Sequence, residues 1–185
     1  MKNKNSILII SALAVAINIV LGTLVSRLQI PLLFLDTLGT IFIAALYGPW
    51  YGASVGAITN ILTPILSGNP KDIPFFIVNA AIGLIVGIIA KKYKFGTKQA
   101  IITGIILAIV APLIGTPIAV YVYGGLTGSG NDIIFSILKQ SGAEVFTAAF
   151  IPRIAGNLID KILSCLLASY MIKRLPKEYI RGDNI

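Results

Sequence analysis

The sequence contains no histidine and a single cysteine, Cys165, in 185 residues. A disulfide within the chain is therefore excluded, and so is a catalytic triad built on histidine. The histidine and cysteine sets that bind most transition metals are missing too. No nucleophile–base pair is visible, although Asp160 and Glu144 could in principle transfer protons. We therefore expect no metal, no cofactor and no catalytic activity in this chain.

Charged residues are scarce as well. They make up 12% of the chain, against 56% hydrophobic residues, whereas a soluble domain carries about 25% charged residues. Several apolar runs reach the roughly 20 residues that a bilayer-spanning helix needs. The composition predicts an all-α membrane protein with a single integral membrane domain over residues 1–185 and a short polar tail from about residue 173.

The net charge of +8 does not indicate a nucleic-acid partner, because the basic residues flank the apolar runs. Lysine and arginine concentrate in cytoplasmic loops next to membrane helices. We therefore expect these flanks, and both termini, on the cytoplasmic side of the lipid bilayer. Ten of the 15 basic residues lie in the flanks: Lys2, Lys4, Lys91, Lys92, Lys94, Lys98, Lys173, Arg174, Lys177 and Arg181.

Breaks rich in proline, glycine and asparagine divide the chain into six predicted transmembrane helices, which should form a compact bundle. These helices cover about residues 6–25, 37–47, 51–66, 74–90, 99–121 and 144–172. A short amphipathic segment is expected at 133–140. With both termini in the cytoplasm, the loops 26–35, 67–73 and 122–142 are external.

Small residues recur at four-residue spacing in three of the predicted helices. This spacing puts them on one helix face, where another backbone can approach closely. The positions are Gly48, Gly52 and Gly56, then Gly83 and Gly87, and finally Ala12 and Ala16. For the glycines we expect contact between the third and fourth helices.

The last predicted helix carries an unusual polar face in the stretch FIPRIAGNLIDKIL. Arg153, Asn157, Asp160 and Lys161 follow the spacing i, i+4, i+7 and i+8, which places them on one side of a helix. A charged side chain in hydrocarbon costs at least about 2.5 kcal/mol. Arg153 and Asp160 are separated by roughly 10 Å along the axis, so each needs another helix, water or a solute. The alternative is a polar cluster that only locks helices together, with Lys161 reaching towards the interface.

Further polar and aromatic side chains fall in the outer half of the predicted bundle. Asn60, Phe75, Asn79, Tyr121 and Glu144 could meet the polar face of the last helix. Flat rings beside amides and charges are typical of ligand pockets, so we expect these residues to bind a solute. For Tyr121 a place in the interfacial aromatic belt is the alternative.

Two phrases, LDTLGTIFIAALYGPWYGASVG and NLIDKILSCLLASYMIKRLP, together with the six short helices and the AxxxA pair, resemble the substrate-binding S components of energy-coupling factor (ECF) transporters. The resemblance covers nearly the whole chain. It implies a multi-pass protein of a prokaryotic plasma membrane that captures a scarce micronutrient with high affinity. Transport would require a transmembrane coupling subunit and two cytoplasmic ATPases.

The resemblance also implies roles for individual residues. Ala12 and Ala16 would dock on the coupling subunit. The loop SRLQIPLLFLD would contribute Arg27, Gln29 and Phe34 to a lid over the pocket.

The substrate class follows from the polar residues and from what is missing. Nickel and cobalt members use an N-terminal Met-His pair, which this chain lacks. Arg153 favours an anionic or carbonyl group and Asp160 an amine or ring N–H. Together they favour a vitamin-like or nucleobase-like substrate.

Two other function classes fit a small membrane bundle. A solitary secondary carrier or channel is one, but carriers often show inverted repeats and none is evident. A membrane sensor or assembly subunit without transport is the other, and the 185 residues contain no signalling domain of their own.

Overall fold

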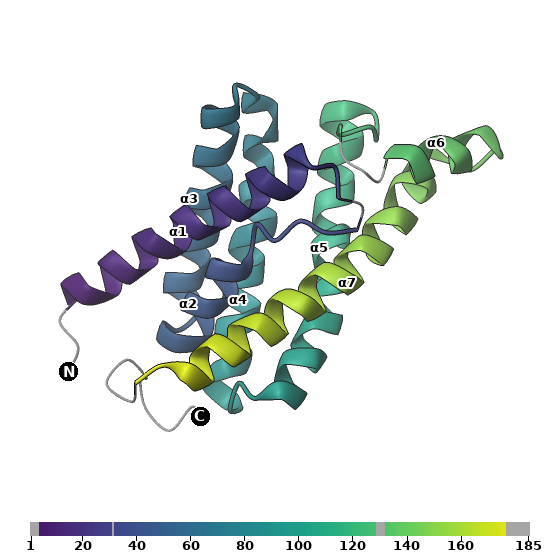
Figure 1. The fold of residues 1–185 in the computed structure, drawn as a ribbon. Helices are drawn as coiled ribbons and strands as arrows, with labels where there is room; N and C mark the ends of the chain where they lie inside the picture. Colours follow the sequence, from purple (N-terminus) through teal and green to yellow (C-terminus); the bar gives the residue numbers. More distant parts are fainter. Residues whose placement is uncertain (1–3, 31, 129–131, 177–185) are drawn as a thin grey trace.

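The structure is a computed structural model that describes residues 4–30, 32–128 and 132–176. The predicted polar tail beyond residue 176 and part of the loop 122–142 lie outside the described residues. Within them the chain is all-helical, as predicted (Figure 1). The elements are α1 (Lys4–Arg27), α2 (Leu38–Tyr47), α3 (Pro49–Ser67), the 3-10 helix η1 (Pro70–Phe75), α4 (Phe76–Lys92), α5 (Thr97–Tyr123), α6 (Asp132–Gln140) and α7 (Val145–Arg174).

Glycines at positive φ set several of the helix boundaries. Gly48, at φ 100°, separates α2 from α3, and Pro49 then occupies the first helical position of α3. Gly68 and Gly124 end α3 and α5 in the left-handed region. Only glycine enters this region without a steric cost from Cβ, so the predicted boundaries follow from local chemistry.

Four of the helical segments are long and apolar enough to cross a membrane: Lys4–Arg27, Pro70–Lys92, Thr97–Tyr123 and Val145–Arg174. Helix α2 is apolar but shorter, with ten residues. Helix α3 has 19 residues but includes Asn60, two threonines and two prolines, which lower its mean hydropathy. A count of six spans therefore stays a prediction.

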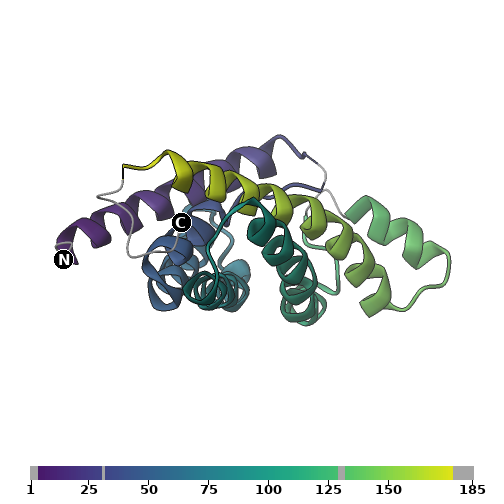
Figure 2. The same cartoon turned by 90° about the horizontal axis from the view of Figure 1, so that it is seen from below.

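The helices form two layers. Helices α1 and α7 run obliquely across the layer made by α2 to α5 (Figures 1 and 2). The most extensive pairings are α5 with α7 and α3 with α4. Helix α1 begins and α7 ends at the same end of the bundle as the C-terminus of α4 (Figure 1), where Lys91 and Lys92 lie. This is the clustering of basic flanks that the sequence predicts.

The glycine-spaced faces of α3 and α4 meet, as predicted. A Cβ atom on Gly83 would collide with the backbone of Gly52, and one on Gly87 would collide with Pro49. A Cβ on Gly56 would strike the carbonyl of Asn79. The two backbones are therefore in direct contact, which small residues alone permit.

A buried amide joins α1, α2 and α3 near the centre of the bundle. The Nδ2 atom of Asn18 donates to Oγ1 of Thr40 at 2.9 Å and to Oγ1 of Thr59 at 3.1 Å. Its Oδ1 atom accepts the backbone N–H of Gly39 at 2.6 Å. Because Asn18 is fully buried, each of these bonds offsets the cost of removing a polar group from water.

Candidate substrate site

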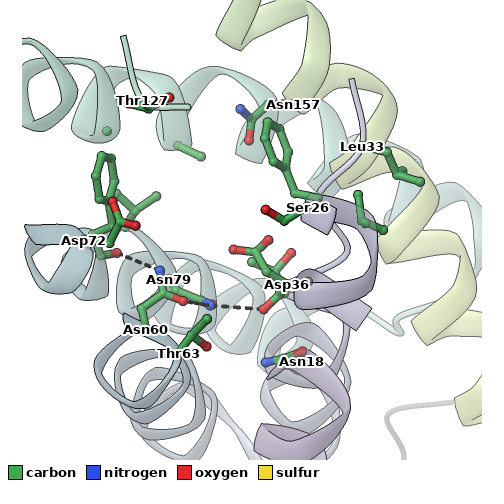
Figure 3. A pocket seen from close by; sticks show the side chains of 18 of the residues that line it. Asn18, Ser26, Leu33, Asp36, Asn60, Thr63, Asp72, Asn79, Thr127 and Asn157 are labelled. Carbon is green, nitrogen blue, oxygen red and sulfur yellow. Dashed lines mark hydrogen bonds between the residues drawn. The ribbon is translucent and has the colours of Figure 1, made fainter. Parts of the chain in front are cut away.

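A cavity of about 340 Å³ lies between the loop that follows α1, the C-terminal half of α3, η1, the start of α4, and the middle of α5 and α7 (Figure 3). This volume falls in the range of small-molecule pockets, about 300–1,000 Å³. Its wall is partly apolar. The polar and charged side chains that line it include Asn18, Ser26, Gln29, Asp36, Thr37, Asn60, Thr63, Ser67, Asp72, Asn79, Thr127, Arg153, Asn157 and Lys161.

Six of the nine side chains selected from the sequence line this cavity: Phe34, Asn60, Phe75, Asn79, Arg153 and Asn157. They come from the loop after α1, from α3, η1 and α4, and from α7. Gln29, a predicted lid residue, also lines it, whereas Arg27 is exposed at the end of α1. The structure therefore brings together most of the set that was predicted from composition and position.

Three selected side chains lie elsewhere. Tyr121 is 92% exposed on the outer face of α5, because its helical phase turns it away from the bundle. Glu144 is exposed at the start of α7, about 13 Å along the axis from Arg153. Asp160 is fully buried and does not line the cavity. Its carboxylate contacts the backbone of the loop after α1 and the Lys161 ammonium.

Arg153 joins α7 to the loop after α5. Its Nη1 atom donates to the Ala149 carbonyl at 2.7 Å, and Nη2 donates to the Gly125 carbonyl at 3.2 Å and to Oγ1 of Thr127 at 3.4 Å. The guanidinium forms no salt bridge with any residue that the structure describes. Since an arginine carries five N–H donors, donors remain for a ligand. Half-buried at the cavity wall, Arg153 suits an anionic or carbonyl group.

Two asparagines form a hydrogen-bonded wall opposite. The Nδ2 atom of Asn79 donates to Oδ1 of Asn60 at 2.9 Å and to the carbonyl of Asp36 at 3.3 Å (Figure 3). Asn60 in turn donates to the carbonyl of Phe75 at 3.2 Å. The amides thus fix α3, α4 and the loop after α1 relative to one another. On α7, Asn157 donates to the carbonyl of Arg153 at 2.8 Å.

An ion cluster attaches the loop to α7. One carboxylate oxygen of Asp160 accepts the backbone N–H groups of Phe34 and Leu35 at 2.9 and 2.8 Å. The other contacts Nζ of Lys161 at 2.6 Å. The same ammonium donates to Oγ1 of Thr37 at 3.0 Å and lies 3.7 Å from Oδ1 of Asp36. Lys161 is 3% exposed, so it does not reach the interface.

The polar face of α7 therefore has two functions that the sequence left as alternatives. Arg153, Asn157 and Lys161 line the cavity. Asp160 and Lys161 hold the loop after α1. A buried charge needs a partner of opposite sign and hydrogen bonds to offset desolvation, and both are present here.

Sequence reasoning missed two carboxylates in the wall, Asp36 and Asp72. Asp36 had a detectable signal, because it is the lone charge in the apolar run LLFLDTLGTIF. Asp72 lies in a polar turn and had none. The structure brings Asp72 to the cavity wall, where it accepts hydrogen bonds from Tyr123 at 2.9 Å and from Asn69 at 2.9 Å.

A family model described as the substrate-specific component of ECF transporters matches residues 7–172. The match includes every residue of the cavity wall and confirms the resemblance seen in the sequence. The chain has no significant match among curated proteins or among solved structures.

Proposed function

We infer that this chain, which belongs to the family of ECF transporter substrate-specific components, captures a vitamin-like or nucleobase-like micronutrient in the cavity between its first loop and α7. The main support for this proposal is that one cavity with partly apolar walls is lined by four polar side chains: Arg153, Asn157, Asn60 and Asn79. Amides and a guanidinium fix the polar edge of a ligand, and the apolar wall accepts its body.

The cavity suits a water-soluble molecule entering from one side of the membrane. Its lining residues on α1, α3 and α4 lie in the C-terminal halves of α1 and α3 and in the N-terminal half of α4, away from Lys91 and Lys92 at the end of α4. By the positive-inside bias, we assign the lysine-rich end to the cytoplasm and the cavity to the outside of the plasma membrane. All six apolar helices, α1 to α5 and α7, then cross the bilayer as one domain with both termini inside.

The loop after α1 is proposed as the lid. Three of its non-glycine residues, Gln29, Leu32 and Leu35, have positive φ angles of 51°, 64° and 53°. Such residues are uncommon in this region and concentrate where a backbone is held by its surroundings. Phe34 lies beside the Lys161 ammonium, 5.9 Å from Nζ to the ring centroid, and faces the cavity.

Uptake requires partners that supply energy, and the family implies them: a transmembrane coupling subunit and two cytoplasmic ATPases. We propose that the coupling subunit docks on the outward face of α1. Ala12 and Ala16 are exposed there, between apolar neighbours such as Leu8 and Leu13, both 59% exposed. The small pair lets a partner helix approach closely.

Mass spectrometry of metabolites released from the detergent-purified chain by denaturation tests the proposed capture. The wild-type chain is expected to release one near-stoichiometric small molecule. The double variant Arg153→Ala with Asn157→Ala should release none, while Glu144→Gln, outside the cavity, should behave as the wild type. Equal retention by the double variant would place the ligand elsewhere, and no retained metabolite after supplying a complete vitamin mixture would count against tight capture.

A further inference from the structure

The cavity wall includes the carboxylate of Asp36, one oxygen of which accepts no hydrogen bond from the described residues. Asp36 follows the lid and points into the open space of the cavity (Figure 3). Its side chain is 37% exposed, and its buried Oδ1 atom has no hydrogen-bond partner among the described residues. A buried polar atom without a partner costs free energy, so this group calls for an explanation.

The nearest cation is already engaged. Lys161 lies 3.7 Å from Asp36 but only 2.6 Å from Asp160, and it also donates to Thr37. Two carboxylates therefore share one ammonium. Asp160 receives two backbone N–H bonds in addition, whereas Asp36 receives none on Oδ1. Two carboxylates on one ammonium leave the cluster with one excess negative charge, and Asp36 is the carboxylate of the pair that lines the cavity.

The remaining charges of the cavity wall do not remove this excess. Arg153 is a further cation of the cavity wall, and Asp72 is a further anion. Asp36, Asp72 and Asp160 carry three negative charges, and Arg153 and Lys161 carry two positive charges. One negative charge is therefore left uncompensated. In a site of low dielectric, such a charge interacts strongly with any cation that enters.

If the cavity captures a substrate as proposed above, its charge can be inferred too. We propose that this substrate is a small organic cation. Its charged nitrogen carries N–H groups and binds the Asp36 carboxylate. An N–H donor can bond the part of the Asp36 carboxylate that is exposed to the cavity, and its positive charge neutralises the cluster. Charge-assisted hydrogen bonds of this kind are the stronger ones in proteins.

Arg153 and the aromatic rings define the rest of this substrate. Arg153 has donors left for a hydrogen-bond acceptor such as a carbonyl at the other end of the molecule. Phe34 and Phe75 line the cavity between and suit a flat apolar body. The proposed substrate is therefore a ring that carries one positively charged amine or amidine. Its hydrogen-bond acceptor lies at the end remote from that charge.

A bare metal cation is a poorer occupant of the same place. Within the described residues no group of three or more histidine, cysteine, aspartate or glutamate side chains could hold a metal ion. Calcium takes about six to eight oxygen ligands and magnesium requires near-octahedral geometry, whereas Asp36 supplies one carboxylate. An organic cation needs only that carboxylate and a shaped cavity.

The test compares benzamidinium with benzamide, two flat probes of nearly the same shape that differ in charge. Binding is measured on the full chain in lipid nanodiscs, for the wild type and for Asp36→Asn. The wild type is expected to prefer benzamidinium by about tenfold or more in Kd, and the preference should vanish in Asp36→Asn. The control Glu144→Gln removes a negative charge outside the cavity and should keep the preference.

Each result decides between the two proposals. Equal binding of the two probes that is lost in Asn157→Ala overturns the cationic class but keeps the cavity as a capture site. A preference for benzamidinium that survives in Asp36→Asn assigns it to another group and overturns the role of Asp36. No binding of either probe, together with no retained metabolite, overturns both the cationic class and capture.

The empty protein provides a readout that does not depend on any probe. If Asp36 is held for a ligand, Asp36→Asn relieves its repulsion from Asp160 and should raise the unfolding temperature of the ligand-free chain. If Asp36 serves mainly as a structural partner of Lys161, the same substitution should lower it. A lowered unfolding temperature would overturn the proposal.

Discussion

Asp160 on α7 accepts a hydrogen bond from the backbone N–H of Leu35 at 2.8 Å, across 125 positions of the sequence. The same oxygen holds Phe34, and the second oxygen holds Lys161. A carboxylate that the sequence suggested as a ligand contact thus anchors the loop after α1, the proposed lid, to α7.

Replacing this anchor should destabilise the protein and weaken binding together. Asp160→Ala removes two hydrogen bonds to the lid and leaves the Lys161 ammonium without its closest partner. Breaking a buried ion pair by removing one member costs about 3–5 kcal/mol. Thermal unfolding in detergent should show this loss, and limited proteolysis should cut the loop after α1 sooner than in the wild type. An unchanged unfolding temperature would contradict the anchoring role.

The wall residue Arg153 should matter for affinity. Arg153→Ala should weaken binding of the retained metabolite at least tenfold, or about 1.4 kcal/mol, because the donors that face the cavity are lost. Isothermal titration with the identified metabolite measures the change. Tyr121→Ala provides the matched control, since Tyr121 is 92% exposed and does not line the cavity. Equal affinities for wild type and Arg153→Ala would remove Arg153 from the site.

The contact between α3 and α4 should not tolerate a methyl group. Gly83→Ala places a Cβ against the backbone of Gly52 and Ala53, and overpacking of this kind costs about 1–3 kcal/mol. We expect a lower unfolding temperature and a smaller yield of folded protein. Gly96→Ala is the control, because a Cβ there meets nothing within 4 Å and Gly96 is in the extended region. Similar losses in both variants would show that the close approach is not the cause.

The outward face of α1 should be needed for transport and not for capture. Ala12→Leu with Ala16→Leu enlarges two exposed side chains, so stability and metabolite retention should stay as in the wild type. Co-purification with the coupling subunit, and uptake by cells that produce the whole transporter, should fall. Ile109→Phe enlarges an exposed residue of α5 and should leave both unchanged. Full uptake by the double variant would place the docking surface elsewhere.

The sequence alone determined the helical class, the approximate helix boundaries and the contact of the glycine faces. These properties depend on short-range chemistry: apolar length, glycine at positive φ, and small residues one turn apart. It also identified six side chains of the cavity wall, because polar and aromatic residues in apolar helices rarely lack a partner.

Only the tertiary structure decided how the charges are divided. Asp160 and Lys161 share a helix face with Arg153 and Asn157, so spacing could not separate their roles. The loop after α1 binds Asp160 with its backbone N–H groups, so Asp160 is buried against the loop while Asp36 of the same loop lines the cavity. Tyr121 and Glu144 fell outside the cavity for a similar reason, since helical phase and the distance to neighbouring elements are fixed by packing over the whole bundle.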